Sequence, residues 1–475
     1  MTVEVIGFIA LAVGLFSFFF DASFLVCAFY CATILGSAAA FVLDSLGGTN
    51  ISPAHLLLGF LAVKLLGDKQ VRARILEGIS PGRPGFWLLL TAIYSAISAY
   101  VMPRLFAGQT FVFAVRALDP YSAPLAPVMS NLTQSIYIIA DCVCFLLLYG
   151  YAGDSAGQST VRKAAICCIV LNLVFAGLDL VTYATGTTEL LAFIRNANYS
   201  LISEAELGGM KRIVGSHIEA SSFAAATIGY FAYTGRLWLA GIRPRLTFTL
   251  SLLSLLGLIF STSSTAYGCL AATLLLGYVA ALLALVRRRA TYQMVYFLVG
   301  APAITLLIVC VIGLNENLSD PIVSLLTETI FNKYSTASGI ERSSWNAQAL
   351  QVFVDTYGFG AGNGSVRTSS FPLAVIASLG TIGTTFFSLF FVGLFFGGNR
   401  LGAHQQVEQA YRQAAKSACV AWLIAGAISG ALTDMGLHFF VFAPIACSPS
   451  AISLYKATLG SSVFRKGPRP GLGAS

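Results

Sequence analysis

Three arginines lie in polar segments that separate long apolar runs. Arg212 lies in the segment 211–219, Arg342 in the segment 338–345, and Arg367 directly after a glycine-rich stretch. A guanidinium group offers a planar fork of N–H donors that fits two phosphate oxygens at once. Three such groups on separate segments predict a pyrophosphate site at the surface of the layer that the apolar runs occupy.

The glycine-rich stretch places a glycine at every second position from 358 to 364. Backbone amides of a glycine-rich turn that leads into a helix can bind an anion, so we expect Gly360, Gly362, Gly364 and Ser365 to contact the ligand. The stretch is not a P-loop, because no Gly-Lys-Ser/Thr follows, and no strand precedes it as in a dinucleotide site. The alternative is that the glycines only allow close backbone packing.

The elements that must position these residues are membrane-spanning helices. Of the 475 residues, 57% are hydrophobic and 10% are charged, whereas a soluble domain carries about 25% charged residues. Apolar runs of the length that crosses a bilayer recur along the chain, and the alternating strands of a membrane barrel are absent. Helices satisfy their own backbone groups in lipid, so we predict an all-α polytopic membrane protein.

We expect about 12–13 transmembrane helices in a single domain of residues 1–458. The predicted spans are 4–20, 23–43, 53–67, 86–102, 131–150, 164–183, 219–234, 246–261, 265–286, 293–313, 371–396, 418–433 and 438–457. A basic Gly/Pro tail, 459–475, follows and is predicted to be cytoplasmic.

Lysine and arginine concentrate in the short loops, which the positive-inside rule assigns to the cytoplasm. These loops hold Lys69, Arg72, Arg74 and Arg83; Arg162 and Lys163; Arg236, Arg243 and Arg245; Arg287, Arg288 and Arg289; and Arg400, Arg412 and Lys416. The longer loops 103–130, 184–218 and 314–370 then face outward. The start of the chain is ambiguous, because three short spans before Lys69 put the N-terminus outside and two put it inside. The net charge of +8 follows from this arrangement and does not indicate nucleic acid binding.

Ten cysteines lie in or beside apolar runs, so we expect them to pack as small hydrophobic groups. The four histidines are far from the cysteine pairs in sequence, and no metal or cofactor site is predicted. Ionisable residues inside spans are costly and often functional. Asp141 and Asp179 are expected to hydrogen-bond between helices, whereas Asp434 and His438 lie near a short outer turn.

In their order, these features resemble the O-antigen ligase and polysaccharide repeat-unit polymerase superfamily. The segment 342–383 carries Arg342, Trp345, the glycine ladder, Arg367 and an apolar run that ends Ser-Leu-Gly-Thr-Ile-Gly. Two further stretches are similar to motifs of that family: the segment 212–215 before a small-residue span, and the Ser-rich hairpin 261–268. The resemblance covers about residues 200–400.

The resemblance implies a membrane-type (GT-C-like) glycosyltransferase with a large periplasmic loop and no metal or nucleotide-sugar site. Members transfer glycan from undecaprenyl pyrophosphate to an acceptor hydroxyl at the outer face of the bacterial inner membrane. By that resemblance, Arg212, Arg342 and Arg367 bind the pyrophosphate, and Trp345 lies in the substrate site. Fixed cations in a partly dry site strongly stabilise the charge that grows on a leaving group. A flippase and a chain-length regulator are the expected partners.

One departure from the family pattern bears on the reaction. Ligases carry a His-Asn pair just before the span that follows the large loop, where this chain has Ser369 and Ser370. This favours a polymerase, in which the acceptor is another lipid-linked repeat unit, and both serines are expected to contact substrate. Lys333 would add to the cationic rim unless it is only a solvated surface lysine.

The acceptor hydroxyl needs a group that takes its proton, unless the departing pyrophosphate does so. His217 and Glu219 are the nearest candidates to a predicted pocket arginine, since histidine titrates near neutrality. The alternative for His217 is that it caps or lines a helix start.

Two other functions remain open at this point. The first is a ligase that moves finished glycan from the lipid carrier to another acceptor. The second is a transporter or flippase for lipid-linked oligosaccharide. Transporters usually show two related halves and helices broken near mid-membrane. The sequence shows no such halves, and its polar residues gather on one face rather than at mid-depth.

Overall fold

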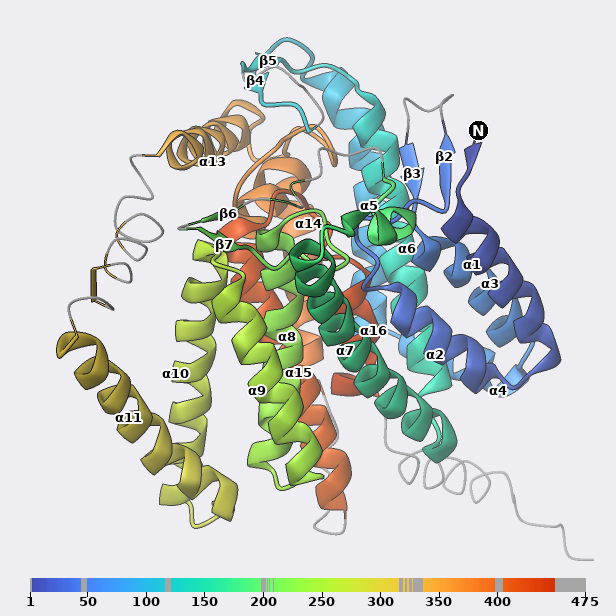
Figure 1. Ribbon diagram of the computed structural model, residues 1–475. Coiled ribbons are helices and arrows are strands. Elements are labelled where there is room, and N and C mark those ends of the chain that lie inside the picture. The colour runs from blue at the N-terminus through green and yellow to red at the C-terminus, as the bar shows by residue number, and fades with distance from the viewer. Residues whose placement is uncertain are drawn as a thin grey trace, which may run out of the picture.

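The computed structural model describes residues 2–43, 49–115, 121–197, 202, 204, 206–207, 209–315, 319–320, 323, 327, 336–397 and 405–448. Lys333, Arg400 and the predicted tail 459–475 lie outside the described residues. The chain forms a bundle of helices with short strands gathered at one end (Figure 1).

The bundle contains long and short helices. The helices are α1 (Val5–Phe16), α2 (Ala22–Ala32), α3 (Pro53–Leu66), α4 (Lys69–Gly78), α5 (Pro84–Leu105), α6 (Met129–Tyr151), α7 (Ser155–Ala184), α8 (Ala220–Leu239), α9 (Pro244–Phe260), α10 (Ser264–Val286), α11 (Tyr292–Gly313), α13 (Ala337–Asp355), α14 (Phe371–Phe396), α15 (Gln406–Ser429) and α16 (Leu437–Cys447), with 3-10 turns η1 (Ser17–Phe19) and η3 (Thr188–Ile194). The strands are β1 (Thr2–Val3), β2 (Phe41–Leu43), β3 (Thr49–Ile51), β4 (Phe111–Val112), β5 (Ala123–Pro124), β6 (Glu206–Leu207) and β7 (Met210–Lys211).

Local sequence decides where many helices begin. Proline is the first residue of α3, α5 and α9, where its missing N–H removes no helical hydrogen bond. The side chains of Asp68, Asp154 and Thr336 each accept a hydrogen bond from the first turn of α4, α7 and α13.

Within the described residues, six helices are long and apolar enough to cross a membrane: α5, α6, α7, α10, α11 and α14. Shorter apolar helices are α1 with η1, α2, α3, α9 and α16. The structure thus confirms a mostly helical chain in which several helices are long and apolar enough to span a membrane. It does not give thirteen full-length spans, because several predicted spans are too short or too polar as helices.

The predicted span 23–43 is wrong in its second half. Helix α2 ends at Ala32, and the chain then turns and enters β2. The backbone groups of this stretch are paired with other segments, because the Ser37 amide donates to the Ser216 carbonyl and the Ala40 amide to the Ile51 carbonyl. Those contacts replace the helical hydrogen bonds that a span would need.

The N-terminus lies at the same end of the bundle as α13 and strands β2 to β7, here called the α13 end (Figure 1). Strand β1 pairs with β2, and β2 pairs with β3. Three short apolar helices, α1, α2 and α3, precede α4.

The loops predicted to be cytoplasmic meet at the opposite end. Arg74 pairs with Asp154 at 2.8 Å and so joins α4 to the start of α7. The Arg162 guanidinium carbon lies 4.6 Å from the centroid of the Tyr411 ring. Arg236 donates to the Gln413 side chain at 2.6 Å. These contacts place the basic loops together, opposite the α13 end.

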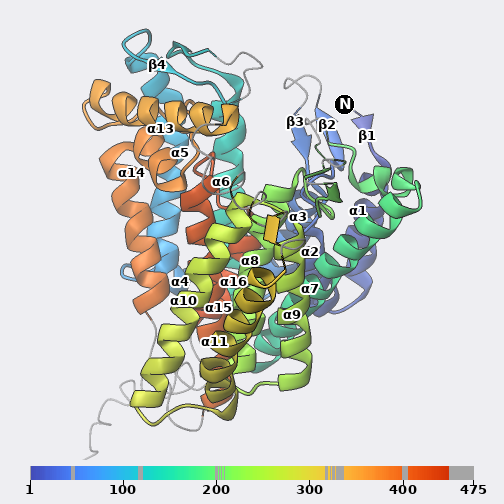
Figure 2. The same cartoon turned by 60° about the vertical axis from the view of Figure 1, so that its left-hand side comes forward.

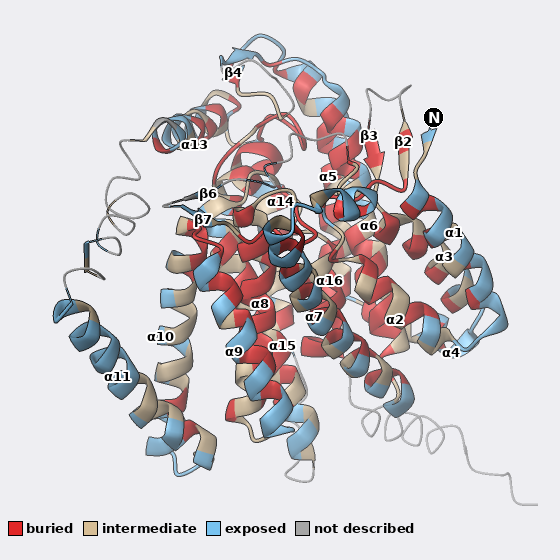
Figure 3. Ribbon diagram, in the orientation of Figure 1, coloured by how far each residue is buried: buried red, intermediate tan, exposed pale blue. Residues whose placement is uncertain are grey.

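Helices α8, α15 and α16 pack against one another near the centre of the bundle (Figure 3). Aromatic rings pack between them: Trp422 meets Tyr230 and Phe442 edge-on, with ring centroids 5.7 and 5.1 Å apart. Gly229 of α8 makes this possible, since a Cβ there would lie 2.0 Å from the Trp422 ring. Helix α11 lies at the margin and is mostly exposed (Figure 3), as suits a helix that faces lipid.

The segment 358–370, here called the glycine strap, passes between α5, α6 and α14. Helix α14 is broken at Gly380, which has φ 61° and ψ −164°, a feature that the sequence did not reveal. The strap fills the break: the Ala361 and Gly362 amides donate to the carbonyls of Ala377 and Ser378, and the Thr381 amide donates to the Gly358 carbonyl.

Replacing Gly360 by Ala should destabilise the protein through both backbone conformation and crowding. Gly360 has φ 81°, and a Cβ there would lie 2.6 Å from the Gly380 nitrogen. Gly82→Ala is the matched control, because Gly82 has φ 85° but nothing within 4 Å. We expect the control to cost about 1–2 kcal/mol and Gly360→Ala to cost about 1–3 kcal/mol more. Thermal unfolding of the purified variants measures both, and equal melting temperatures would contradict the packing role.

Candidate functional site

Helix α13 lies across the α13 end, above α5 and α14 (Figure 2). One face of α13 is buried: Trp345, Ala349 and Val352 recur at helical spacing, and the last two pack in a small core with Phe106 and Val366. This satellite core lies apart from the main core of the bundle. It fixes α13, and with α13 the side chains of Arg342 and Trp345.

Arg367 and Trp345 are in direct contact. The Arg367 guanidinium carbon lies 4.0 Å from the centroid of the Trp345 ring, a cation–π stack. The next residue of α13, Asn346, accepts the Ser369 amide at 2.8 Å. Arg342 lies three residues before Trp345, so both project from the same side of the helix. Stacking leaves the edge of a guanidinium free to donate, and no ion pair joins Arg342 or Arg367 to the described residues.

Arg212 lies at the same end but beside other elements. Its Nε donates to the Ser261 carbonyl at 3.4 Å, in the Ser-rich turn between α9 and α10. Burial lowers the pKa of Arg212, while the nearby Glu219 and Tyr267 act in the opposite direction. No contact between Arg212 and the other two arginines is seen. The structure thus stacks Arg367 on Trp345, one turn of α13 from Arg342, and leaves Arg212 beside the α9–α10 turn.

Most amides of the glycine strap are already used within the protein. Those of residues 360, 361, 362, 365, 367, 368, 369 and 370 all donate to protein oxygens. A Cβ at Gly362 or Gly364 would lie 2.6 Å from the Ser98 carbonyl oxygen or 2.3 Å from the Ser130 carbonyl oxygen. These contacts support close backbone packing, the alternative interpretation, over the predicted anion-binding turn. Ser365 is likewise engaged, because its hydroxyl donates to the Ala361 carbonyl at 3.0 Å.

Asp179 organises the segment that precedes α8. Its carboxylate pairs with Arg195 at 2.6 Å and with Lys211 at 3.5 Å. The same carboxylate accepts the amides of Val214 and Gly215 at 2.8 and 3.1 Å. Asp179 therefore binds the outer loop, rather than a second helix as expected from the sequence. It sets the path of the chain next to Arg212.

His217 lies in a closed environment. Its Nε2 is 3.3 Å from the Asn172 Oδ1, and its ring meets Phe223 edge-on at 5.9 Å. Burial, with a smaller effect of His438, lowers the pKa of His217 to about 3. A group with this pKa is a weak proton acceptor at neutral pH. These contacts favour the interpretation that His217 lines a helix start, and Glu219 accepts a hydrogen bond from Ser221 beside it.

A group of polar side chains that the sequence analysis did not assemble lies next to the glycine strap. We call it the polar centre. It consists of Asn50, His55, Gln134, Asp141, Asn363, Asp434 and His438. The carboxyl groups of Asp141 and Asp434 lie near each other, and both His55 and His438 lie within electrostatic reach of Asp434. Among the described residues, no group of three His, Cys, Asp or Glu side chains could hold a metal ion.

The polar centre connects to the arginine site through the strap. The Thr433 hydroxyl donates to the Asn363 Oδ1 at 2.6 Å, and the Thr368 amide donates to the Ala431 carbonyl at 3.2 Å. Asp434 therefore lies one residue beyond a direct contact with the strap that carries Arg367. The two groups face the same region of the α13 end.

A sequence signal for the polar centre exists at the start of α6. The first two turns of this apolar helix contain five buried polar residues: Ser130, Asn131, Thr133, Gln134 and Ser135. Such a cluster at the end of a predicted span indicates an internal polar surface. The charged residues of the sequence alone do not reveal this cluster.

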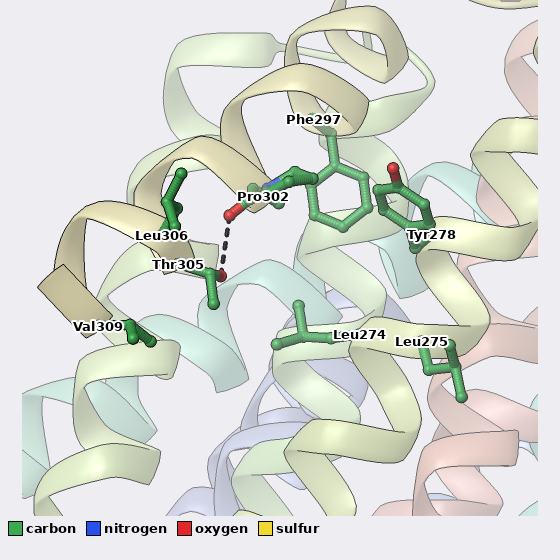
Figure 4. Close-up of a pocket in the computed structure, with 9 residues that line it drawn as sticks. Leu274, Leu275, Tyr278, Phe297, Pro302, Thr305, Leu306 and Val309 are labelled. Atoms are coloured by element: carbon green, nitrogen blue, oxygen red, sulfur yellow. Dashed lines mark hydrogen bonds between the residues drawn. The ribbon is translucent and has the colours of Figure 1, made fainter.

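A hollow of about 520 Å³ lies between α10 and α11, away from this site (Figure 4). Its lining is apolar and includes Leu274, Phe297, Pro302 and Val309. No side chain there carries a charge. It therefore suits hydrocarbon and not a pyrophosphate.

Comparison of the chain with protein-family models, with curated proteins and with solved structures finds no match. The function has to be argued from the chemistry of the arginine site and the polar centre. The arginine site comes from one stretch of the chain, residues 342–367, whereas the polar centre is assembled from segments that are far apart in sequence.

Replacing Asp179 by Ala should leave Arg195 buried without its counter-charge. The side chains of this pair are only 1% and 8% exposed, and breaking a buried pair costs about 3–5 kcal/mol. Glu77→Ala is the control, since the Glu77–Arg83 pair is 32% and 39% exposed and should be worth less than about 1 kcal/mol. Thermal unfolding in detergent measures both losses of stability. Similar losses in the two variants would contradict the stabilising role of the buried Asp179–Arg195 pair.

Acidification should weaken the fold through His217. The pKa of His217 is about 3 in the folded protein and 6.5 ordinarily, so the unfolded chain binds the proton more readily between these values. The contribution to stability is fully present above pH 6.5 and is lost as the pH falls toward 3. Between pH 7 and pH 5 the loss is about 2 kcal/mol. The melting temperature of His217→Gln, measured over this range, should fall less than that of the parent protein, and parallel curves would refute the assignment.

Proposed function

We propose that the protein polymerises undecaprenyl-pyrophosphate-linked oligosaccharide repeat units at the periplasmic face of the bacterial inner membrane. The product would be an exopolysaccharide or O-antigen chain. The observation that carries the proposal is the Arg367–Trp345 stack with Arg342 one helical turn away, at the end of an apolar bundle. Two guanidinium groups that form no ion pair with the described residues, at a membrane surface, suit the pyrophosphate of a lipid-linked donor.

The chemistry requires one bond to form and one to break. The acceptor hydroxyl oxygen attacks the anomeric carbon of the donor sugar, and the bond from that carbon to the pyrophosphate oxygen breaks. Arg342 and Arg367 stabilise the charge that passes to the pyrophosphate. Arg212 supplies a further cation at the same end of the bundle.

The proton of the acceptor hydroxyl passes to a carboxylate in this proposal. Asp434 is the best placed candidate, because it is partly exposed and follows the turn that contacts the glycine strap. Asp434 replaces His217 as the proposed proton acceptor, because His217 is enclosed by Asn172 and Phe223. Glu219, beside Arg212, remains a second candidate.

Two other functions remain as alternatives. A ligase would use the same donor chemistry with a different acceptor, and Ser369, where ligases carry histidine, argues against it. A flippase or transporter would need a polar path through the bundle. The arginine site and the polar centre both lie toward the α13 end, which favours a transferase. A flippase and a chain-length regulator are the partners that we propose.

Arg367→Ala and Arg342→Ala should abolish polymerisation without loss of inserted protein. Arg104→Ala is the matched control, because its guanidinium also stacks on a ring, Tyr100, at 4.0 Å, but on the exposed side of α5. The assay gives purified protein in liposomes a lipid-linked repeat unit and resolves the chain lengths formed. Loss of one charged donor should reduce the rate about 100–1000-fold.

Replacing Arg367 by Lys tests geometry in the same assay. A lysine keeps the charge but lacks the fork of donors, so elongation should still be impaired. Near-normal chain growth in both alanine variants would overturn the proposal. Transfer of a single glycan to another lipid, without elongation, would favour the ligase.

A further inference from the structure

The polar centre contains buried amide groups that the protein itself does not satisfy. Both side-chain groups of Asn50, the Oε1 of Gln134 and the Nδ2 of Asn363 have no hydrogen-bond partner among the described residues. These side chains are only 4%, 5% and 0% exposed. Buried amides are normally paired, because leaving them unpaired is costly.

The three amides come from three separate elements and are held along one face of α6. The Asn131 side chain donates to the Asn363 carbonyl at 2.7 Å, which ties the strap to the first turn of α6. Gln134 follows one turn later. Tyr137 then donates to the Asn50 carbonyl at 3.3 Å, which ties β3 to the next turn.

The charge around these amides selects the kind of ligand. The neighbouring carboxyl groups of Asp141 and Asp434 form no ion pair with any lysine or arginine of the described residues. They would repel a phosphate or a uronic acid. An amide offers a donor and an acceptor, as a sugar hydroxyl does, and the His55 and Tyr137 rings, 5.2 Å apart, provide flat surfaces beside them.

We propose that Asn50, Gln134 and Asn363 form a subsite for the hydroxyl groups of an uncharged sugar. The subsite rests on the proposed function, because it would hold a sugar of the glycan whose pyrophosphate lies at the arginines. It divides the substrate by charge: the anionic part binds at the rim, and the neutral part binds in the polar centre. The protein should therefore discriminate against repeat units that place an acidic sugar there.

The test measures sugar binding without any lipid or pyrophosphate. Full-length protein in detergent is titrated with maltotriose and with triacetylchitotriose, and binding is followed by saturation-transfer NMR. Trigalacturonic acid is the acidic probe. We expect a neutral trisaccharide to bind and the acidic one not to bind.

Asn50→Leu and Gln134→Leu should each weaken that binding about tenfold or more. They lie on different elements, so a folding defect in one leaves the other as the test. Gln109→Leu, an exposed amide at the same end, is the matched control and should bind normally. The melting temperatures of the two test variants should not fall, because an unpaired amide contributes no hydrogen bond. Asn196→Leu should lower the melting temperature, since the Asn196 side chain accepts the Ala39 amide and donates to the Ala39 carbonyl.

Three results would overturn the subsite: no binding of either neutral sugar, binding that both leucine variants retain, or equal binding of the acidic probe. Lower melting temperatures in both variants, with no binding, would show that the amides pair with internal water. Arg367→Ala should bind neutral sugar normally. A failure of polymerisation with intact sugar binding would therefore count against the proposed function and not against the subsite.

Discussion

The glycine strap is the element on which the outer part of the structure depends. It passes so close to α5, α6 and α14 that its backbone, rather than its side chains, makes the contacts. Gly360, Gly362 and Gly364 each have positive φ and a neighbouring backbone atom within 3 Å of the position that a Cβ would take. The strap thereby holds Asn363 against α6 and Arg367 against Trp345. The two polar sites share a single support.

The arginine site carries positively charged groups, whereas the polar centre carries carboxyl groups. This difference follows from the positions of the two sites in the fold. Guanidinium groups at the rim remain partly hydrated, and stacking on Trp345 covers only one face of Arg367. Deeper in, an isolated charge is expensive, and the carboxyl groups of Asp141 and Asp434 face each other there. A substrate with an anionic end and a neutral end matches this order. A uniformly charged substrate does not.

The sequence predicted the helical membrane class, most apolar segments and the polar segments that carry the arginines. It also predicted that Arg342, Trp345 and the segment around Arg367 belong together, since they are close in the chain. Hydrophobicity and charge determine these features locally. The ends of helices were less predictable, as α2 shows, because contacts with distant segments replace helical hydrogen bonds at 33–43.

The polar centre could not be predicted from the sequence, for a different reason. Asn50, Gln134 and Asn363 are uncharged, and each one alone is an ordinary polar residue near the end of an apolar run. Only the fold shows that the backbones at Asn363 and Asn50 are bonded to successive turns of α6, on either side of Gln134. The same holds for Asp179, whose partner Arg195 lies in a loop whose path no pattern specifies.

The break in α14 bears on the choice between a transferase and a transporter. In transporters, broken helices leave backbone groups that face a substrate path near mid-membrane. Here the carbonyls of Ala377 and Ser378 accept the amides of Ala361 and Gly362, and the Thr381 amide donates to the Gly358 carbonyl. The strap uses these freed groups, so they do not line a path. A helix break that is closed by the protein's own backbone fixes a site in place, which a transferase needs and an alternating carrier does not.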